Sequence, residues 1–324
     1  MCTALTYKTH DHYFGRNLDI ESCNNEKMII IPRNFRLVFR QEKDLYNHYA
    51  MIGIGIIQDG YPLYYDGTNE KGLSMAGLNF PETAEYKPME EGSSNITPYE
   101  FIPWILGQCA TVSEVREKLN HMNLVNINFS EELLLSPLHW MISDREESIT
   151  VEAVKNGLNV YDNPVGILTN NPVFDVQMFN LNNYMHITTT APENSFSDML
   201  DLKPYSCGMG ALGLPGDYSS ASRFVKASFL KMNSVSGDSE SESISQFFRI
   251  LGAVAFPRGC VCLGEKKYEM TVYSSCCNVD KGIYYYITYE NSRITGVDMY
   301  KEDLSGTQLI IYPLISEQQI WMQN

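Results

Sequence analysis

The sequence predicts an α+β protein in which layers of strands and helices pack against each other. Strand-like runs cluster toward both ends of the 324-residue chain, and helical patterns are concentrated between them. A doubly wound parallel sheet would instead need strands and helices to alternate along the whole chain. The composition, with 44% hydrophobic and 19% charged residues, is typical of a chain with a large core. Because no repeat or independent segment divides the chain, we expect a single domain over residues 1–324.

The N-terminal strands are expected to begin with a hairpin. The polar run from Lys8 to His12 has the composition of a tight turn between strand-like segments 3–8 and 13–18. Further strands are expected at 28–31, 36–40 and 49–57, and near the C-terminus at 270–275, 282–289, 294–300 and 309–312. Three central segments, 138–143, 149–154 and 158–161, also alternate in the manner of strands.

The helices are predicted from their start signals and apolar stretches. Thr97-Pro98 opens an apolar stretch that continues through residue 106, and Thr111 with Glu114 forms a capping-box pattern before residues 115–119. Three more helices are expected at 174–184, 220–231 and 243–254. The serine-rich stretch 233–243 is interpreted as a surface loop that precedes the last of these helices.

Two short patterns resemble known motifs but lack the structural context that those motifs need. Gly208 to Gly213 has the spacing of a dinucleotide-binding loop, yet the preceding residues are not strand-like and Leu-Pro-Gly-Asp follows. We interpret it as a glycine-rich loop. Ser74 lies in a near match to a nucleophile elbow, but the last glycine is missing and strand-like residues follow. Ser74 is therefore expected to be structural.

The charge and hydropathy of the chain exclude several classes of partner. Thirty-nine acidic against twenty-four basic residues give a net charge of −15, which repels phosphate backbones and anionic membranes. We therefore expect no nucleic-acid and no membrane partner. The longest apolar stretch, 49–57, is nine residues long, whereas a membrane helix needs about 20. The N-terminus also lacks the features of a secretory signal, which favours a cytoplasmic location.

The eight cysteines do not indicate a disulfide scaffold, and a cytoplasmic location would keep them reduced. Two pairs stand close in sequence, Cys260 with Cys262 and Cys276 with Cys277, but neither has the spacing of a zinc site. The six histidines supply no spaced set of partners. We therefore expect neither a metal nor a cofactor.

The cysteine at position 2 is the most informative single residue. Removal of the initiator methionine would leave Cys2 with a free α-amino group. Thiols ionise near pH 8.5 and α-amines near 7.7 to 8.0, so one residue would hold a nucleophile and a base suited to neutral pH. Position alone is weak support, since most cysteines are inert core residues.

Two charged residues are expected to return beside Cys2 across the first hairpin. Arg16 and Asp19 lie in the second predicted strand. A guanidinium favours a thiolate, and a carboxylate can orient an α-ammonium group. Because residues three apart on a regular strand point to opposite faces, both can serve only if the strand ends or bulges near Leu18. A surface ion pair is the alternative interpretation.

Five sequence blocks occur in order along the chain. They are Met-Cys-Thr-Ala at 1–4, Phe-Gly-Arg-Asn-Leu-Asp at 14–19, Gly-Leu-Ser-Met-Ala-Gly-Leu-Asn-Phe-Pro at 72–81, Leu-Thr-Asn-Asn-Pro at 168–172 and Leu-Pro-Gly-Asp-Tyr-Ser-Ser-Ala-Ser-Arg-Phe at 214–224. With further matches at 138–144 and 281–286, the chain resembles the choloylglycine hydrolase family over nearly its whole length. That family includes bile salt hydrolases and penicillin V acylases.

The resemblance implies a four-layer αββα sandwich of the N-terminal-nucleophile hydrolase type. It implies that Cys2 is the nucleophile and, through its own amine, the proton carrier. Arg16 and Asp19 would then position and tune the thiol.

The resemblance also implies residues that stabilise the oxyanion formed during amide hydrolysis. Asn79 would offer its backbone N–H and Asn170 its side-chain amide, while Arg223 would complete the polar cluster. Asn171 is the alternative to Asn170, and we choose Asn170 because the family pattern places the asparagine one residue before a variable position and proline. Taken singly, such residues are more often turn formers or solvated cations.

The substrate that the resemblance implies is a bile salt conjugated to glycine or taurine. Residues proposed for the substrate pocket are Leu18, Ile20, Phe80, Leu133 and Leu135. A sterol body would supply apolar area that offsets the repulsion between an anionic ligand and an acidic protein. A penicillin V acylase and a catalytically silent binding protein with the same fold are the alternatives. The resemblance also implies a homo-oligomer, a tetramer.

Overall fold

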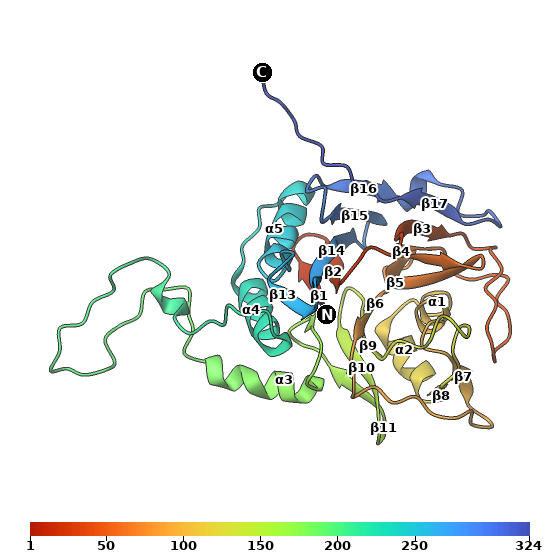
Figure 1. The fold of residues 1–324 in the computed structure, drawn as a ribbon, viewed down its shortest axis with the longest axis horizontal. Coiled ribbons are helices and arrows are strands. Elements are labelled where there is room, and N and C mark those ends of the chain that lie inside the picture. Colours follow the sequence, from red (N-terminus) through yellow and green to blue (C-terminus); the bar gives the residue numbers. More distant parts are fainter.

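The computed structural model describes all residues 1–324, which form two stacked β-sheets between two layers of helices (Figure 1). Helices α4 and α5 cover the outer face of one sheet, and α1 and α2 cover the outer face of the other. This arrangement confirms the expected αββα sandwich. No helix is long and apolar enough to cross a lipid bilayer.

The first sheet has seven strands and contains the N-terminal residues. Its order is β12 (Ile167–Leu168), β1 (Cys2–Lys8), β2 (His12–Ile20), β14 (Lys267–Asn278), β15 (Ile283–Thr288) and β16 (Thr295–Asp298), with β13 (Val261–Gly264) paired to β14. The predicted hairpin is present, because β1 pairs antiparallel with β2 from Cys2 opposite Leu18 to Lys8 opposite His12. Both β1 and β2 are interior strands of this sheet, and nearly all of their residues are buried on both faces.

The second sheet has eight strands and faces the first. Its order is β11 (Gly157–Asp162), β10 (Ser148–Val154), β9 (Leu138–Ser143), β6 (Ser74–Asn79), β5 (Tyr61–Asn69), β4 (Met51–Gln58), β3 (Lys27–Ile31) and β17 (Ile310–Pro313). A separate parallel pair joins β7 (Ser94–Ile96) to β8 (Met122–Leu124). Strands from both ends of the chain therefore contribute to both sheets.

The helices come from the middle of the chain, as predicted. They are α1 (Phe101–Leu106), α2 (Val112–Leu119), α3 (Phe174–Asn180), α4 (Ser220–Asn233) and α5 (Glu240–Gly252), with short 3₁₀ turns at Leu181–Tyr184, Met209–Ala211 and Met299–Lys301. Helix α2 begins after Thr111, whose side chain accepts a hydrogen bond from the Glu114 amide at 3.2 Å. Helix α5 begins earlier than predicted, because Ser239 and Glu242 form a capping box inside the serine-rich stretch.

Two buried apolar clusters hold the layers together. The larger, of 37 residues, joins residues of both sheets to α4 and α5. The smaller, of 25 residues, lies between the second sheet and helices α1 and α2. Apolar side chains on both faces of the central strands explain why those strands are predominantly buried rather than alternately exposed.

One predicted strand, at 36–40, is wrong. The side chains there do alternate between buried and exposed, but the backbone forms only an isolated bridge between Leu37 and Leu45. The Arg40 amide donates instead to the carboxylate of Glu100 at 2.6 Å. The alternation of buried and exposed side chains therefore indicated an extended segment. Its backbone pairs with the loop residue Leu45 and with the side chain of Glu100 next to α1, not with a neighbouring strand.

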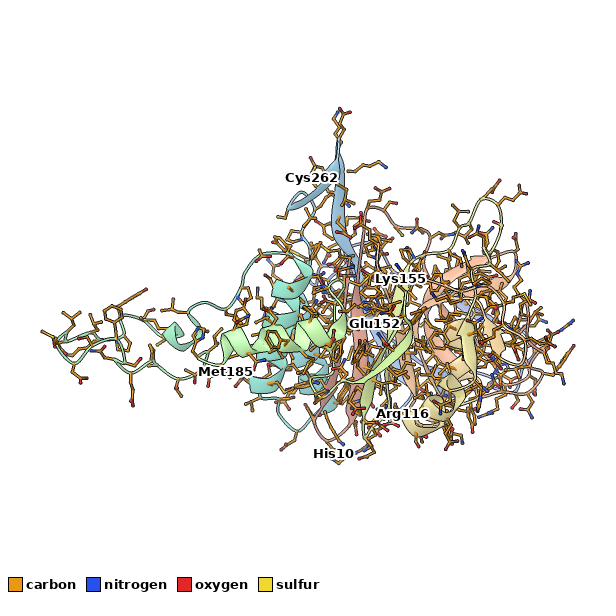
Figure 2. The ribbon with its side chains drawn as sticks, turned by 90° about the horizontal axis from the view of Figure 1, so that it is seen from below. His10, Arg116, Glu152, Lys155, Met185 and Cys262 are labelled. Carbon is orange, nitrogen blue, oxygen red and sulfur yellow. The ribbon has the colours of Figure 1, made fainter.

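The two motifs rejected from the sequence are confirmed as structural. Gly208 precedes a 3₁₀ turn in irregular chain, with no strand before it. Ser74 begins strand β6 and its buried hydroxyl lies 2.7 Å from that of Thr68. The glycine-rich loop belongs to a long arm that leaves the sandwich near Met185 and returns at α4 (Figures 1 and 2).

Candidate active site

Cys2 lies at the start of β1, in the middle of the first sheet. Its side chain is 3% exposed and belongs to the large apolar cluster. Its backbone N–H donates to Oδ1 of Asn170 at 2.9 Å. The edge position of β12 beside β1 brings the segment after Leu168 to the nucleophile candidate.

Arg16 contacts the thiol directly from the neighbouring strand. One guanidinium nitrogen lies 2.5 Å from the Cys2 sulfur, and another donates to the carbonyls of Tyr65 at 3.0 Å and Gly77 at 2.5 Å. Those carbonyls belong to the second sheet, so this fully buried side chain bridges the two sheets. Burial alone disfavours its charge, but the nearby Cys2 sulfur and the carboxylate of Asp66 raise the pKa of Arg16. The charge is thus held rigidly against the sulfur.

Asp19 leaves the strand on the other face from Arg16. Strand β2 continues unbroken through Ile20, and the irregularity lies in β14, between Thr271 and Tyr273. One carboxylate oxygen of Asp19 accepts from the Thr271 hydroxyl at 2.5 Å, and the other is buried without a partner. Burial raises the pKa of Asp19, against the lowering effect of Arg223. Arg16 therefore contacts the sulfur, whereas Asp19 reaches the start of the chain through its backbone, which pairs with Met1, and its carboxylate forms no hydrogen bond with Cys2.

Asn170 is a hub of hydrogen bonds next to Cys2. Its Oδ1 accepts from the Cys2 amide and from Arg223 at 2.7 Å, and its Nδ2 donates to the Asn79 carbonyl at 2.6 Å. The Asn170 amide donates to the Ser220 hydroxyl at 2.8 Å, at the start of α4. The structure therefore brings together Asn79 and Asn170, which lie 91 residues apart.

Asn171 points away from this cluster. Its side-chain amide donates to the Pro81 carbonyl at 3.0 Å and to the Thr83 hydroxyl at 2.6 Å. The peptide bond between Asn171 and Pro172 is cis. The two neighbouring asparagines therefore have different partners: the side chain of Asn170 contacts Cys2, and that of Asn171 does not.

Arg223 on α4 closes the other side of the cluster. Its guanidinium donates to the Cys2 carbonyl at 2.5 Å and to the Thr3 hydroxyl at 2.6 Å, and it lies over the ring of Phe256. The side chain is 1% exposed, so its interactions replace hydration almost completely. Arg223 is therefore part of the site, not a solvated surface cation.

Met1 occupies the outer side of Cys2. Its amine donates to the Asp19 carbonyl at 2.6 Å and forms an ion pair with the buried carboxylate of Glu269. Burial lowers the pKa of this amine. The nitrogen of Cys2 is here a peptide nitrogen, so removal of Met1 would convert it into an amine that faces Asn170 Oδ1 and would free the Asp19 backbone groups that now pair with Met1.

An apolar cavity of about 380 Å³ lies beside the residues that hold Arg16. Tyr65 and Gly77, whose carbonyls accept from Arg16, form part of its wall. The remaining wall comes largely from leucine and aromatic residues: Asn24, Ile56, Leu63, Tyr64, Pro98, Tyr99, Ile102, Phe129, Leu133, Leu134, Leu135, Ser136 and Leu138. The arrangement therefore offers a large apolar group a cavity that shares two wall residues with the binding site of the Arg16 guanidinium.

The cavity includes two of the five predicted pocket residues. Leu133 and Leu135 line it. Leu18 is buried in the core, Ile20 packs against that core, and Phe80 is fully buried, so these three lie outside this cavity. Tyr65 and Phe129 were missed, although the position of Phe129 shortly before the predicted pocket residues Leu133 and Leu135 was a usable signal.

The two stacked sheets, their helical layers and a cysteine at the head of a central strand define an N-terminal-nucleophile hydrolase architecture. A sequence profile of the linear amide C–N hydrolases, choloylglycine hydrolase family, matches residues 2–312. The chain belongs to this family of amide-bond hydrolases, as the sequence blocks predicted.

Several relatives resemble the chain over all or nearly all of their lengths. The bile salt hydrolase/transferase of Lactiplantibacillus plantarum is 56% identical and covers 100% of both chains. The bile salt hydrolase/transferase of Clostridium perfringens is 45% identical over 96% of each. The crystal structure of the mutant C2A conjugated bile acid hydrolase from Clostridium perfringens has a TM-score of 0.93, with 43% identity and complete coverage of both chains. A penicillin V acylase from Agrobacterium tumefaciens shares the fold, with a TM-score of 0.74 at 22% identity over 96% of this chain and 91% of its own.

Proposed function

We propose that this protein hydrolyses the amide bond of bile salts conjugated to glycine or taurine. The observation that carries the proposal is the contact between the Cys2 sulfur and Arg16 beside an apolar cavity. Full-length relatives named for bile salt hydrolysis support the substrate class. Eleven of the 15 cavity residues are hydrophobic, which suits a sterol body. Burial of apolar area at about 25 cal/mol per Å² offsets the repulsion expected from a protein of net charge −15.

The proposed nucleophile is the Cys2 thiolate, formed after Met1 is removed. Arg16 stabilises the thiolate as an adjacent, buried cation. The freed α-amine takes up the thiol proton, and the unpartnered oxygen of Asp19 is the proposed acceptor that orients this amine.

The first half-reaction forms a thioester. The Cys2 sulfur attacks the amide carbonyl, and the resulting oxyanion is stabilised by the Asn79 backbone N–H and the Asn170 side-chain amide. Asn170 Nδ2 has two N–H donors and uses one for the Asn79 carbonyl, so the second can face the oxyanion. The C–N bond then breaks, and the proton held by the α-amine passes to the departing glycine or taurine.

The second half-reaction releases the bile acid. Water attacks the thioester carbonyl, the α-amine accepts a proton from it, and the C–S bond breaks to regenerate the thiolate. Arg223 is proposed to hold Asn170 and the Cys2 carbonyl in place during both halves. An amine in place of water would give acyl transfer, which matches the hydrolase/transferase names of the relatives.

The test is release of amino acid from a panel of glycine and taurine conjugates, with penicillin V included. We expect turnover of bile conjugates, its loss in Cys2→Ser, and its retention in Cys109→Ala. Cys109 is an apt control because it is also a buried thiol, 3% exposed, but lies in the other core cluster. Preferred cleavage of penicillin V would favour an acylase, and a folded, Met1-free protein without turnover would favour the silent binding protein.

We further propose a single domain over residues 1–324 and a homotetramer. Pairing of β17 with β3 and of β14 with β2 joins the chain ends within one sandwich, which supports a single domain. The arm supports self-association because it exposes apolar side chains, among them Met185, Phe196, Met199 and Tyr205. A cytoplasmic location is proposed as well, in keeping with eight free cysteines. Analytical ultracentrifugation tests the tetramer, since a monomeric sedimentation coefficient would reject it.

A further inference from the structure

A buried histidine touches both segments that carry the proposed oxyanion donors. His139 lies on β9 and is completely buried. Its ring stacks on that of Phe80, with centroids 4.2 Å apart and planes tilted by 6°. Phe80 directly follows Asn79. On the other side, His139 Nε2 lies 3.0 Å from the carbonyl of Thr169, which directly precedes Asn170.

A buried glutamate completes the contact. Glu152 on β10 is completely buried. Its Oε1 is 3.1 Å from His139 Nδ1 and accepts from the Phe174 amide at 3.0 Å. The histidine and the glutamate therefore fix the segment 169–174 at both ends, and Asn170 lies inside that segment.

The two hydrogen-bond partners of the His139 ring determine its orientation. A backbone carbonyl only accepts, so Nε2 donates to Thr169, and Nδ1 shares one hydrogen with Oε1 of Glu152. These two buried hydrogen bonds hold the ring in one orientation. The ring cannot rotate without breaking a buried bond, and its stacked face holds Phe80 in place.

We propose that His139 and Glu152 are positioning residues that set the distance between the Asn79 N–H and the Asn170 amide. The inference rests on the proposed oxyanion roles of Asn79 and Asn170. Neither His139 nor Glu152 contacts Cys2, Arg16 or the apolar cavity in the described contacts. Their effect is therefore on stabilisation of the tetrahedral intermediate, not on thiolate formation or substrate binding.

The expected size of the effect follows from the geometry of oxyanion donors. Loss of one donor lowers kcat by about 10² to 10³, and displacement by about 1 Å can cost about 10². Loosening the 169–174 segment should displace the Asn170 amide without deleting it. The expected decrease in kcat is therefore about ten- to a hundredfold.

The test uses a double variant, His139→Phe with Glu152→Leu. It retains a ring against Phe80 and leaves no unpaired buried charge, whereas either single apolar replacement would strand a partner. Glu152→Gln is the milder variant. A neutral ring can still pair Nε2 with Thr169 and Nδ1 with the new amide NH₂, but that NH₂ cannot accept from the Phe174 N–H, so one of the three bonds is lost. Thr68→Val with Ser74→Ala is the matched control, since it removes another buried polar pair from the same sheet.

Three readouts separate positioning from a general loss of structure. They are kcat and KM for a conjugate that the wild type cleaves, the rate of Cys2 alkylation followed on its peptide, and the thermal unfolding midpoint. We expect the double variant to lose ten- to a hundredfold in kcat, with KM within about threefold and alkylation within about twofold of the wild type. The kcat of Glu152→Gln should lie between those of the double variant and the wild type. The control should keep wild-type kcat.

The inference is overturned if the double variant keeps kcat within about threefold of the wild type, or if kcat, Cys2 alkylation and the unfolding midpoint all change together, as a general loss of structure would cause. If the wild type cleaves no conjugate and no penicillin V, the proposed function fails instead. A crystal structure of the double variant then decides the inference. Displacement of the Asn170 side chain relative to Asn79 supports it, and an unchanged separation rejects it.

Discussion

Replacing Asn170 by alanine tests the oxyanion site, with Asn171→Ala as a control one residue away. Both are asparagines that donate side-chain hydrogen bonds, but only Asn170 contacts Asn79, Arg223 and the Cys2 nitrogen. Asn171 bonds to Pro81 and Thr83 instead. The pair thus compares equal chemical changes on the two sides of one segment.

The expected loss in Asn170→Ala has two parts. Removing an oxyanion donor costs about 2.7 to 4 kcal/mol of transition-state stabilisation, which lowers kcat by about 10² to 10³. Removing Oδ1 also takes one partner from the buried guanidinium of Arg223. A buried polar group left without its partner costs about 1 to 3 kcal/mol of folding stability. We therefore expect a large fall in kcat and a modest fall in stability.

The assay measures kcat and KM from taurine or glycine released from a bile conjugate, with alkylation of Cys2 to count competent sites. For Asn171→Ala, kcat should stay within about threefold of the wild type. The oxyanion role is refuted if Asn170→Ala retains more than about a tenth of wild-type kcat per competent site. Equal losses in the two variants would show that the segment, and not the Asn170 amide, determines the rate.

Three other outcomes follow from the structure. Arg16→Lys keeps a positive charge but cannot bond both carbonyls of the second sheet and the sulfur, so it should lower kcat more than it raises KM in steady-state assays. Phe129→Ala should raise KM about tenfold with little change in kcat, because Phe129 lines the cavity without touching Cys2; an unchanged KM would place the acyl group elsewhere. Burial lowers the pKa of His12 to about 4. The unfolded chain therefore binds a proton that the folded chain does not between pH 6.5 and 4, so stability falls as pH falls through this window. Between pH 6.5 and 4, the free energy of unfolding should fall by about 3 kcal/mol more in the wild type than in His12→Gln, as measured by denaturant titrations at several pH values. The same pH dependence in both proteins would contradict this assignment.

The sequence predicted the layered fold because the hydrophobic patterns of its ends and middle differ so clearly. It did not indicate β5, which begins Tyr61-Pro62 and contains Asp66 and Gly67, residue types depleted in strands. Those residues are tolerated there because Asp66 is buried against two tyrosine hydroxyls of the facing sheet. Tertiary partners of this kind lie far away in sequence, so local propensity cannot report them.

The candidate site was predicted by resemblance more than by local pattern. Cys2 and Arg16 are linked by the hairpin that the polar turn predicts, but the contacts of Asn170 with Asn79 and Arg223 depend on the packing of both sheets and α4. The facing sheet also supplies Tyr65 and Gly77 as anchors for Arg16, which no strand periodicity indicates. Only two of the five predicted pocket residues line the cavity, because Phe80 and Leu18 are buried in the core and Ile20 packs against it.

The central claim is that the first residue of the mature chain forms a covalent bond with the acyl group. Enzyme quenched in acid during turnover of a bile conjugate, digested and measured by mass spectrometry, tests this most directly. The account predicts an N-terminal peptide that lacks Met1 and carries the bile acyl mass on Cys2. Full turnover by protein that retains Met1, or an acyl group found only on another residue, would contradict it.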